Sequence, residues 1–212
     1  DVFFSEHESS AIDASLAAAI KKAGNVGLAV AYDFDSDFNV AGSTHTLPLI
    51  EKNAAGLGHI NLTPEDDGVV RRNKLLVDVG GNKVPSLGLR AAMMALGEKE
   101  FVAGAYDIAL GKRHIPVDAN GFMWINYTGP SSHYPVFSFA DIVQGRINPD
   151  ELKGKILFVG ATALGVYDLR VTPFDRNTPG VEVHATIADN IMSGSFIRRT
   201  GFAGWVDIAL IF

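Results

Sequence analysis

Residues 153–194 constrain the fold of this chain more than any other stretch. They open with a continuous apolar run at 156–159, which is too short for a helix and is bounded by Gly154 and Gly160. Such a run is typical of a strand that is buried on both faces of a sheet. The sequence Gly160-Ala161-Thr162 then predicts a sharp turn at the carboxyl end of this strand. Open α/β sheets place their ligand crevices at that end.

A polar loop and a helix are expected after this turn. The loop carries Asp168, Arg170 and Thr172, and apolar residues then recur at helical spacing from Val181 onward. The predicted ligand-binding residues are Thr162, Asp168, Arg170, Thr172 and His184, with Asp118 and Tyr127 as neighbours. Backbone N–H groups at the glycine turn or at the helix start could hold an anion. The alternative is that these side chains only tie the loop down through hydrogen bonds.

The remaining pattern mixes parallel crossovers with antiparallel hairpins. Helices are expected at 11–22, 86–96 and 138–144, and strands at 2–4, 26–32, 58–62, 69–79, 106–110, 115–117 and 122–127. Gly24 and Gly97 are placed to end the first two helices. Residues 33–57 show no regular pattern. The predicted class is therefore α/β, with a mixed β-sheet flanked by helices and a parallel crossover from 2–4 to 26–32.

Length and composition indicate one α/β domain over residues 1–200. Lys and Arg are not clustered and the net charge is -6, so nucleic acid is not an expected partner. The absence of cysteine excludes disulfides, thiolate catalysis and cysteine-ligated metals. Residues 201–212 are almost wholly apolar, and they form either a final core helix or the start of a membrane helix. Alone they are too short to span a bilayer, which needs about 20 residues.

The motifs of common enzymes and metal sites are incomplete. The GxxxxG spacing at 160–165 lacks the lysine and the hydroxyl residue of a phosphate-binding loop. The acidic stretch at 33–37 begins like a calcium loop but lacks the required Gly and the final Glu. Glu182 and His184 would not face each other on a helix. Neither a G-x-S-x-G elbow nor an HExxH motif occurs. We therefore expect no catalytic residue, no metal and no cofactor.

Three alternatives stay open from the residues alone. Asp168 and His184 could serve as acid and base in a hydrolase or transferase. Arg71 and Arg72 could either pair with acidic side chains at a hairpin base or hold a carboxylate or phosphate ligand. The chain could also be a dimerisation scaffold, which predicts an extensive apolar interface and no well-formed pocket.

The order of several short segments resembles one known family. These segments are Gly58-His-Ile-Asn61, Asp67-Gly-Val-Val-Arg71-Arg72, Val84-Pro-Ser-Leu-Gly-Leu-Arg-Ala-Ala, Ile115-Pro-Val-Asp118-x-x-Gly121, Ile125-Asn-Tyr127-x-Gly129-Pro130, Ser138-Phe-Ala-Asp141-Ile-Val, Lys153-Gly-Lys-Ile-Leu-Phe-Val-Gly160-Ala-Thr-Ala, Thr172-Pro-Phe174 and Pro179-Gly-Val-Glu-Val-His184-Ala. Taken together over nearly the whole chain, they are similar to the type-two CHASE domain. This is the second class of cyclase/histidine-kinase-associated sensory extracellular domains.

The resemblance implies a bacterial sensory domain that lies on the periplasmic face of the inner membrane between membrane helices. The implied output is an adenylate/guanylate cyclase, or less commonly a histidine kinase, serine/threonine kinase or diguanylate cyclase. This fragment itself is then not an enzyme. The implied partners are an unknown small molecule, ion or protein signal, the cell membrane through the flanking segments, and a second copy in a homodimer. The family's opening strand has no counterpart before Asp1, so we expect either a sheet that lacks a strand or a trimmed fragment.

The expected mechanism is a shift between two packing states of the domain. A signal that binds one state better changes their populations. We expect the strand at 156–159 to pass this change, over the glycine turn, to the helix that starts at Val181. That helix would carry it toward the membrane.

Overall fold

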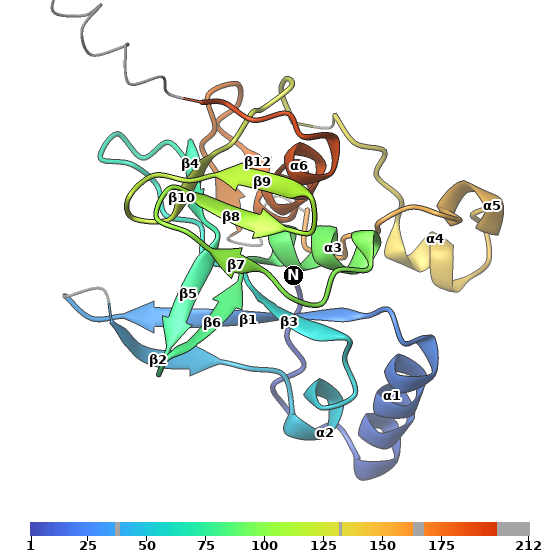
Figure 1. Cartoon of the computed structure of the whole chain (residues 1–212). Coiled ribbons are helices and arrows are strands. Elements are labelled where there is room, and N and C mark those ends of the chain that lie inside the picture. The colour runs from blue at the N-terminus through green and yellow to red at the C-terminus, as the bar shows by residue number, and fades with distance from the viewer. Residues whose placement is uncertain (37–38, 132, 163–167, 199–212) are drawn as a thin grey trace, which may run out of the picture.

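The computed structural model of the chain describes residues 1–36, 39–131, 133–162 and 168–198 (Figure 1). The helices in this part of the chain are α1 (Ser10–Ala23), α2 (Pro48–Glu51), α3 (Leu87–Leu96), α4 (Phe139–Val143), α5 (Pro149–Leu152) and α6 (Gly180–Ser193). The strands are β1 (Gly27–Phe34), β2 (Val40–Thr44), β3 (Gly56–His59), β4 (Arg72–Lys74), β5 (Leu76–Val79), β6 (Asn82–Pro85), β7 (Val102–Ala103), β8 (Asp107–Leu110), β9 (Arg113–Pro116), β10 (Phe122–Trp124), β11 (Leu169–Arg170) and β12 (Thr178–Pro179).

Parallel and antiparallel pairings both occur, which confirms the predicted α/β class with mixed sheets. One sheet has the order β2-β1-β3, in which β1 pairs antiparallel with β2 and parallel with β3. The parallel pair needs a crossover, and the short helix α2 lies in it. The other sheets are antiparallel: β7-β8-β9, β5-β6, β10-β4 and β11-β12.

Helix α3 lies at the centre of the fold, between α6 on one side and strands β1 and β3 on the other. Two glycines allow this close approach. A Cβ at Gly88 would lie 2.6 Å from Ile187 Cγ2 and 2.8 Å from the His184 carbonyl oxygen, and a Cβ at Gly58 would lie 2.6 Å from Leu87 Cα. The main apolar core is continuous from α3 and α6 to β8, β9 and β10, and it includes Leu89, Met93 and Ile187.

A second apolar cluster fixes the amino-terminal helix. Ala17 and Ile20 of α1 pack with Leu28 of β1 and Ile50 of α2. The ends of α1 follow from its sequence, because the Ser9 side chain accepts a hydrogen bond from the Ile12 N–H and Gly24 closes the helix at φ 68°. Figure 1 shows α1 and α2 below the central sheet, on the side away from α6.

The helices and strand β1 were predicted best. Residues 11–22, 86–96 and the segment from Val181 are helical, and 26–32 is a buried strand. Their apolar positions repeat at the period of the element, and Gly24 and Gly97 adopt the left-handed conformation that ends a helix. The predicted short helix after Ser138 is also present as α4, but the Ser138 side chain makes no capping hydrogen bond.

The prediction of a buried strand at residues 156–159 is wrong. These residues are coil, and Ile156, Leu157 and Val159 are 40%, 52% and 49% exposed. A strand needs hydrogen-bonded neighbours. None of the N–H groups of 156–159 donates a backbone hydrogen bond to another described residue, and the Val159 carbonyl accepts only from the amino group of Asp1. An apolar run predicts burial, but it does not supply the partner strand.

Three further boundaries differ from prediction. Residues 2–4 are not a strand; Phe4 instead bonds through its carbonyl to the Leu47 N–H and through its N–H to the Thr46 hydroxyl, so the crossover from 2–4 to 26–32 is absent. Residues 33–57 contain β2 and α2 rather than irregular chain. The expected strand at 69–79 is divided at Leu75 into β4 and β5, which pair with different strands, β10 and β6.

Helices α4 and α5 extend away from the packed body. Neither contains a buried residue, and Phe139 and Val143 are exposed. Figure 1 shows the two helices to one side of the domain, joined to it by long extended connections. The stretch of residues 133–162, which we call the 133–162 segment, therefore combines an apolar sequence with little burial.

Candidate functional site

Asp168 and Arg170 lie together at the start of α6, as expected. Arg170 Nη2 donates to Asp168 Oδ1 at 2.8 Å, and both side chains are about one-third exposed. The carboxylate of Asp168 packs on Gly180, where an added Cβ would lie 2.4 Å from Oδ2, and the Asp168 carbonyl accepts the Gly180 N–H. A carboxylate at this end of a helix is favoured by the helix dipole.

Arg170 has a donor to spare at this position. Its Nε is buried and has no hydrogen-bond partner among the described residues. A buried N–H without a partner costs free energy, so it is a natural donor for an oxygen atom of a ligand or a water molecule.

Thr172 and Thr162 do not join this ion pair. Thr172 is buried, and its hydroxyl bonds to the Asp175 carbonyl and the Thr178 hydroxyl, both at 3.1 Å. It therefore closes its own loop. Thr162 is exposed at the end of a described stretch. For Thr172 the alternative of a purely structural role is the one that the contacts favour.

His184 lies behind this ion pair, in the interior. It is 1% exposed, and its Nδ1 has no hydrogen-bond partner among the described residues. Burial is the main cause that lowers the pKa of His184 to about 3; the interactions with His59, the chain's amino group and Arg170 act in the same direction, and the Ile60 carbonyl opposes the shift. The ring is therefore neutral at ordinary pH.

His59 is a second buried imidazole that the sequence reasoning did not single out. It is the last residue of β3, is 0% exposed, and has no hydrogen-bond partner at either ring nitrogen within the described chain. Burial lowers its pKa to about 3, although the carbonyls of Lys74 and Leu75 lie near enough to favour a proton without forming hydrogen bonds to it. The sequence did contain a signal for this buried ring, because His59 stands among the apolar and glycine residues of a strand.

Asp168 and His184 do not form the acid–base pair that a hydrolase or transferase would need. Asp168 bonds to Arg170, and no hydrogen bond joins it to His184 in the described chain. A general base has to reach its substrate. His184 is closed off by α3, β3 and its own helix, so this alternative has no geometric support.

Asp118 and Tyr127 bind other parts of the fold. The Asp118 carboxylate accepts the N–H groups of Asn120 and Phe122 and also receives Arg72 Nη1 at 2.9 Å. The Tyr127 hydroxyl donates to the Val70 carbonyl at 2.9 Å, and burial raises its pKa. Within the described part of the chain neither residue forms a hydrogen bond or ion pair with Asp168 or His184, so the predicted set divides into at least two places.

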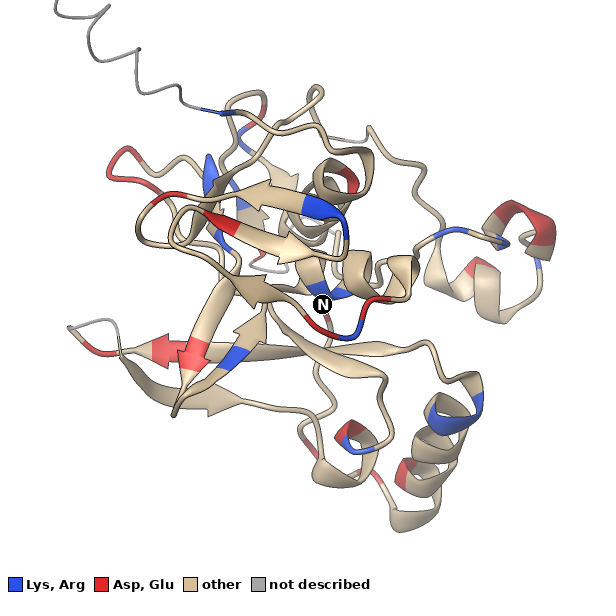
Figure 2. Cartoon of the chain, in the orientation of Figure 1, with Lys and Arg blue, Asp and Glu red and all other residues tan. Residues whose placement is uncertain are grey.

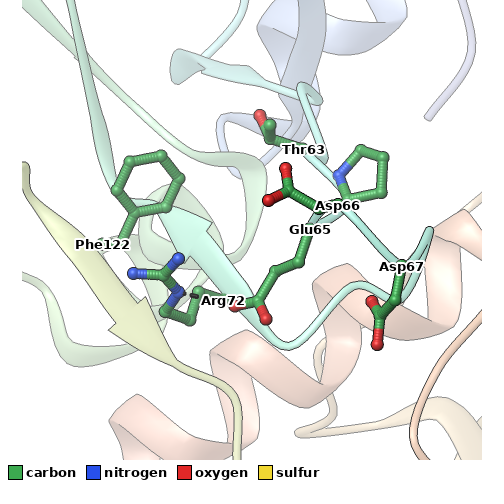
Figure 3. A pocket seen from close by; sticks show the side chains of 7 residues that line it. Thr63, Glu65, Asp66, Asp67, Arg72 and Phe122 are labelled. Atoms are coloured by element: carbon green, nitrogen blue, oxygen red, sulfur yellow. Dashed lines mark hydrogen bonds and ion pairs between the residues drawn. The ribbon is translucent and has the colours of Figure 1, made fainter.

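A cavity of about 410 Å³ lies beside Arg72 (Figure 3). Its lining residues are Thr63, Pro64, Glu65, Asp66, Asp67, Arg72 and Phe122. Figure 3 shows the Arg72 guanidinium between the Phe122 ring and the Glu65 carboxylate, with Asp66 and Asp67 on the loop beside them. Of the residues considered from sequence only Arg72, an alternative anion-binding candidate, lines this cavity; none of the seven predicted ligand-binding residues does.

The arginines at this cavity are held by acidic residues, as the simpler interpretation of the sequence expected. Arg72 pairs with Glu65 at 2.8 Å and lies 5.4 Å and 5.2 Å from the ring centres of Phe122 and Trp124. Arg71 bonds to Asp67 at 2.7 Å, and these hydrogen bonds lower the pKa of Asp67 to about 2. An anionic ligand would have to displace these carboxylates from the arginines.

The charges elsewhere are dispersed. Figure 2 shows Lys and Arg spread over several elements and a group of acidic residues on the loop before β4. Within the described ranges, no group of three or more His, Asp or Glu side chains is placed to hold a metal ion.

The helices in those ranges are also too short and too polar to cross a bilayer. The apolar residues 201–212 lie outside the described residues, so the choice between a core helix and a membrane helix is not tested.

Comparison with known proteins gives one match. The model of the CHASE2 domain family matches residues 1–212, the whole chain. No curated protein and no solved structure matches it.

Proposed function

Because this chain belongs to the CHASE2 domain family, we propose that it is the extracytoplasmic sensory domain of a bacterial membrane receptor, with an adenylate/guanylate cyclase as the output. The family is one of sensory extracellular domains, so the chain is a sensory domain and not a catalytic one. The membrane-bound receptor, its place at the periplasmic face of the inner membrane and the cyclase are the proposed steps. The match over the full length of the chain is the observation that supports them.

The structure favours α6 as the element that carries the signal. This helix is buried on most of its length, including Val183, Ile187 and Ile191. It begins at the Asp168–Arg170 pair and leads to the carboxyl-terminal part of the chain. The strand that was expected to feed it is absent, so the proposed transmission rests on α6 and its contacts with α3 and β3. A change at the pair would alter how firmly the helix start is held.

The proposed ligand site is the start of α6, where Asp168 and Arg170 are accessible. Arg170 Nε and the first turn of α6 favour an anionic group, and Asp168 favours a cation or a hydroxyl donor. Calorimetry or thermal shift with carboxylates, phosphates and cations tests this site on the wild-type chain and on Asp168→Ala and Arg170→Ala. Ligand-induced stabilisation that survives both substitutions would remove the site from consideration. Arg146→Ala, at an exposed ion pair of the 133–162 segment, is the matched control.

The location is testable because the chain has no cysteine. A Lys112→Cys substitution at an exposed position gives one thiol within this domain, and labelling of the unsubstituted gene product is the background to subtract. We expect a membrane-impermeant maleimide to label it in intact cells, while a cysteine placed in the output domain reacts only after lysis. Labelling of position 112 only after lysis would place the domain in the cytoplasm and overturn the proposal. Nucleotide cyclase assays on the same membranes test the output.

A further inference from the structure

The interior of the domain holds two imidazoles that no contact satisfies. His59 on β3 and His184 on α6 are both fully buried, and three of their four ring nitrogens have no hydrogen-bond partner among the described residues. Buried polar groups without partners are uncommon, because each costs free energy without a compensating bond. His59 at the end of β3 lies near enough to His184 of α6 to interact electrostatically with it, and the burial of both rings needs an explanation other than stability.

The surroundings of the pair oppose a positive charge. The charged groups that face it are Lys74 on β4, Arg170 on β11 and the amino group of Asp1, and each imidazole faces the other. The charged residue of α3, Arg90, donates its Nε to the Leu57 carbonyl on β3. Asp168, the carboxylate beside Arg170, is already paired with that arginine. Within the described residues neither imidazole forms an ion pair with a carboxylate, so a proton gained in the packed state has no countercharge.

The packing around the pair is too tight to adapt. The Gly88 position touches both Ile187 and the carbonyl of His184, so α6 cannot move toward α3 to make room for water. Hydration of a protonated His184 therefore requires α6 to move away from α3 and β3. Proton uptake and helix release are linked, since each favours the other.

We propose that His59 and His184 form a proton-operated switch, in which acidification outside the cell releases α6 from β3. This inference specifies the stimulus of the sensory domain and rests on the proposed function for its last step. In the packed state both rings are neutral. In the released state both are hydrated and take up protons with ordinary affinity, so falling pH favours release.

The size of the effect follows from two protons. With ordinary histidines in the released state, the equilibrium for release rises about 60-fold between pH 6 and pH 5 if both rings titrate, and about 8-fold if one does. Two coupled histidines thus give a steep response over one pH unit without any added ligand.

Hydrogen exchange on the wild-type chain tests this directly. After correction for the intrinsic exchange rate, the protection of α6 amides should fall about 60-fold from pH 6 to pH 5. Amides of α1, which packs in a separate apolar cluster, should not follow. Protection of α6 that is independent of pH would overturn the switch. An equal fall in α1 would do so too, because the transition would then be global unfolding.

Variants separate the two rings and the function. In His184→Gln or His59→Gln the pH dependence of α6 protection should drop to about 8-fold; an unchanged dependence overturns the assignment. If neither variant folds, the wild-type slope still decides. In the receptor, output should respond to external pH in the wild type and lose that response in His184→Gln. Release of α6 without any change in output would overturn the proton as the signal, whereas cytoplasmic labelling at position 112 would overturn the proposed location alone.

Discussion

Two regions of the molecule, the α6–α3 contact and the 133–162 segment, are similarly apolar in sequence but differ in burial. Ile187 on α6 is 0% exposed, whereas Ile156 is 40% exposed. The helix finds its partner within the same domain, and the run at 156–159 finds none among the described residues. The comparison teaches that an apolar pattern indicates which side chains a segment can bury. Whether they are buried depends on whether the rest of the fold provides a surface to pack against.

The difference has a consequence for signalling. A tightly packed helix next to unsatisfied histidines can exist in two states, because loss of its contacts is costly until a proton or ligand offsets the cost. An exposed segment has little to lose and stores no such free energy. We therefore place the signal-dependent step at α6 and not at the run that the sequence made most prominent.

Truncation of matched isoleucines should give the largest difference between the two regions. Ile187→Ala should lower the free energy of unfolding by about 4 kcal/mol, since it removes a fully buried side chain beside Gly88. Ile156→Ala should lower it by less than about 0.5 kcal/mol, because that side chain is already solvated. Urea unfolding followed by circular dichroism measures both. Equal losses would mean that residues 156–159 are buried in solution.

Acid should weaken the packed region selectively. The pKa of about 3 for His59 and for His184 lies below the ordinary value of 6.5, so both rings are neutral when folded and take up protons when unfolded. Proton uptake by the unfolded chain therefore costs little stability above pH 6.5, and stability is lost as pH falls from there toward pH 3. Between pH 7 and pH 5.5 we expect a loss of about 2.5 kcal/mol for the two rings.

Urea titrations at each pH measure this loss, and His184→Gln should show about half of it. Asp67→Asn is the control, because hydrogen bonds from Arg71 lower the pKa of Asp67 to about 2, well below this pH range, and the substitution should leave the slope from pH 7 to pH 5.5 unchanged. A flat profile from pH 7 to pH 5.5 would show that the histidines are hydrated in the folded protein.

The sequence predicted local structure well and packing partners poorly. The stripe from Val181 and the glycines at 24 and 97 act within a few residues, so their effect is visible in the chain itself. Asp168 and Arg170 were placed together because they are neighbours in one loop. His59 was missed because it meets the region of His184 only after β3 and α6 pack, 125 positions apart in the sequence. The sequence also could not show that Asp118 lies apart from Asp168, because this too depends on packing between distant segments. Asp118 pairs with Arg72 of β4, the strand that pairs with β10.

Arg72 offers a test at intermediate burial. Arg72→Gln removes ion pairs to Glu65 and Asp118 and the contacts with two aromatic rings. Because these groups are about one-third exposed, solvent screens the charges and we expect a loss of about 1.5 kcal/mol. Arg146→Gln, at an ion pair of the exposed 133–162 segment, should cost less than about 0.5 kcal/mol. Equal costs would show that partial burial does not distinguish the two regions.

Leu157→Asp should have the smallest effect on stability, and it tests the exposed region directly. Leu157 is 52% exposed, and Ile156 and Val159 close to it in the sequence are exposed too. A charge at position 157 therefore loses little hydration, and we expect a change below about 0.5 kcal/mol. The substitution should nevertheless reduce binding of a fluorescent apolar dye, because it interrupts the exposed apolar surface. Phe139→Asp on α4, 64% exposed in the same segment, is the matched control and should act in the same way. A loss of several kcal/mol at position 157 would show that this run is covered in solution. Both regions would then be buried, and they would differ only in the surface against which each one packs.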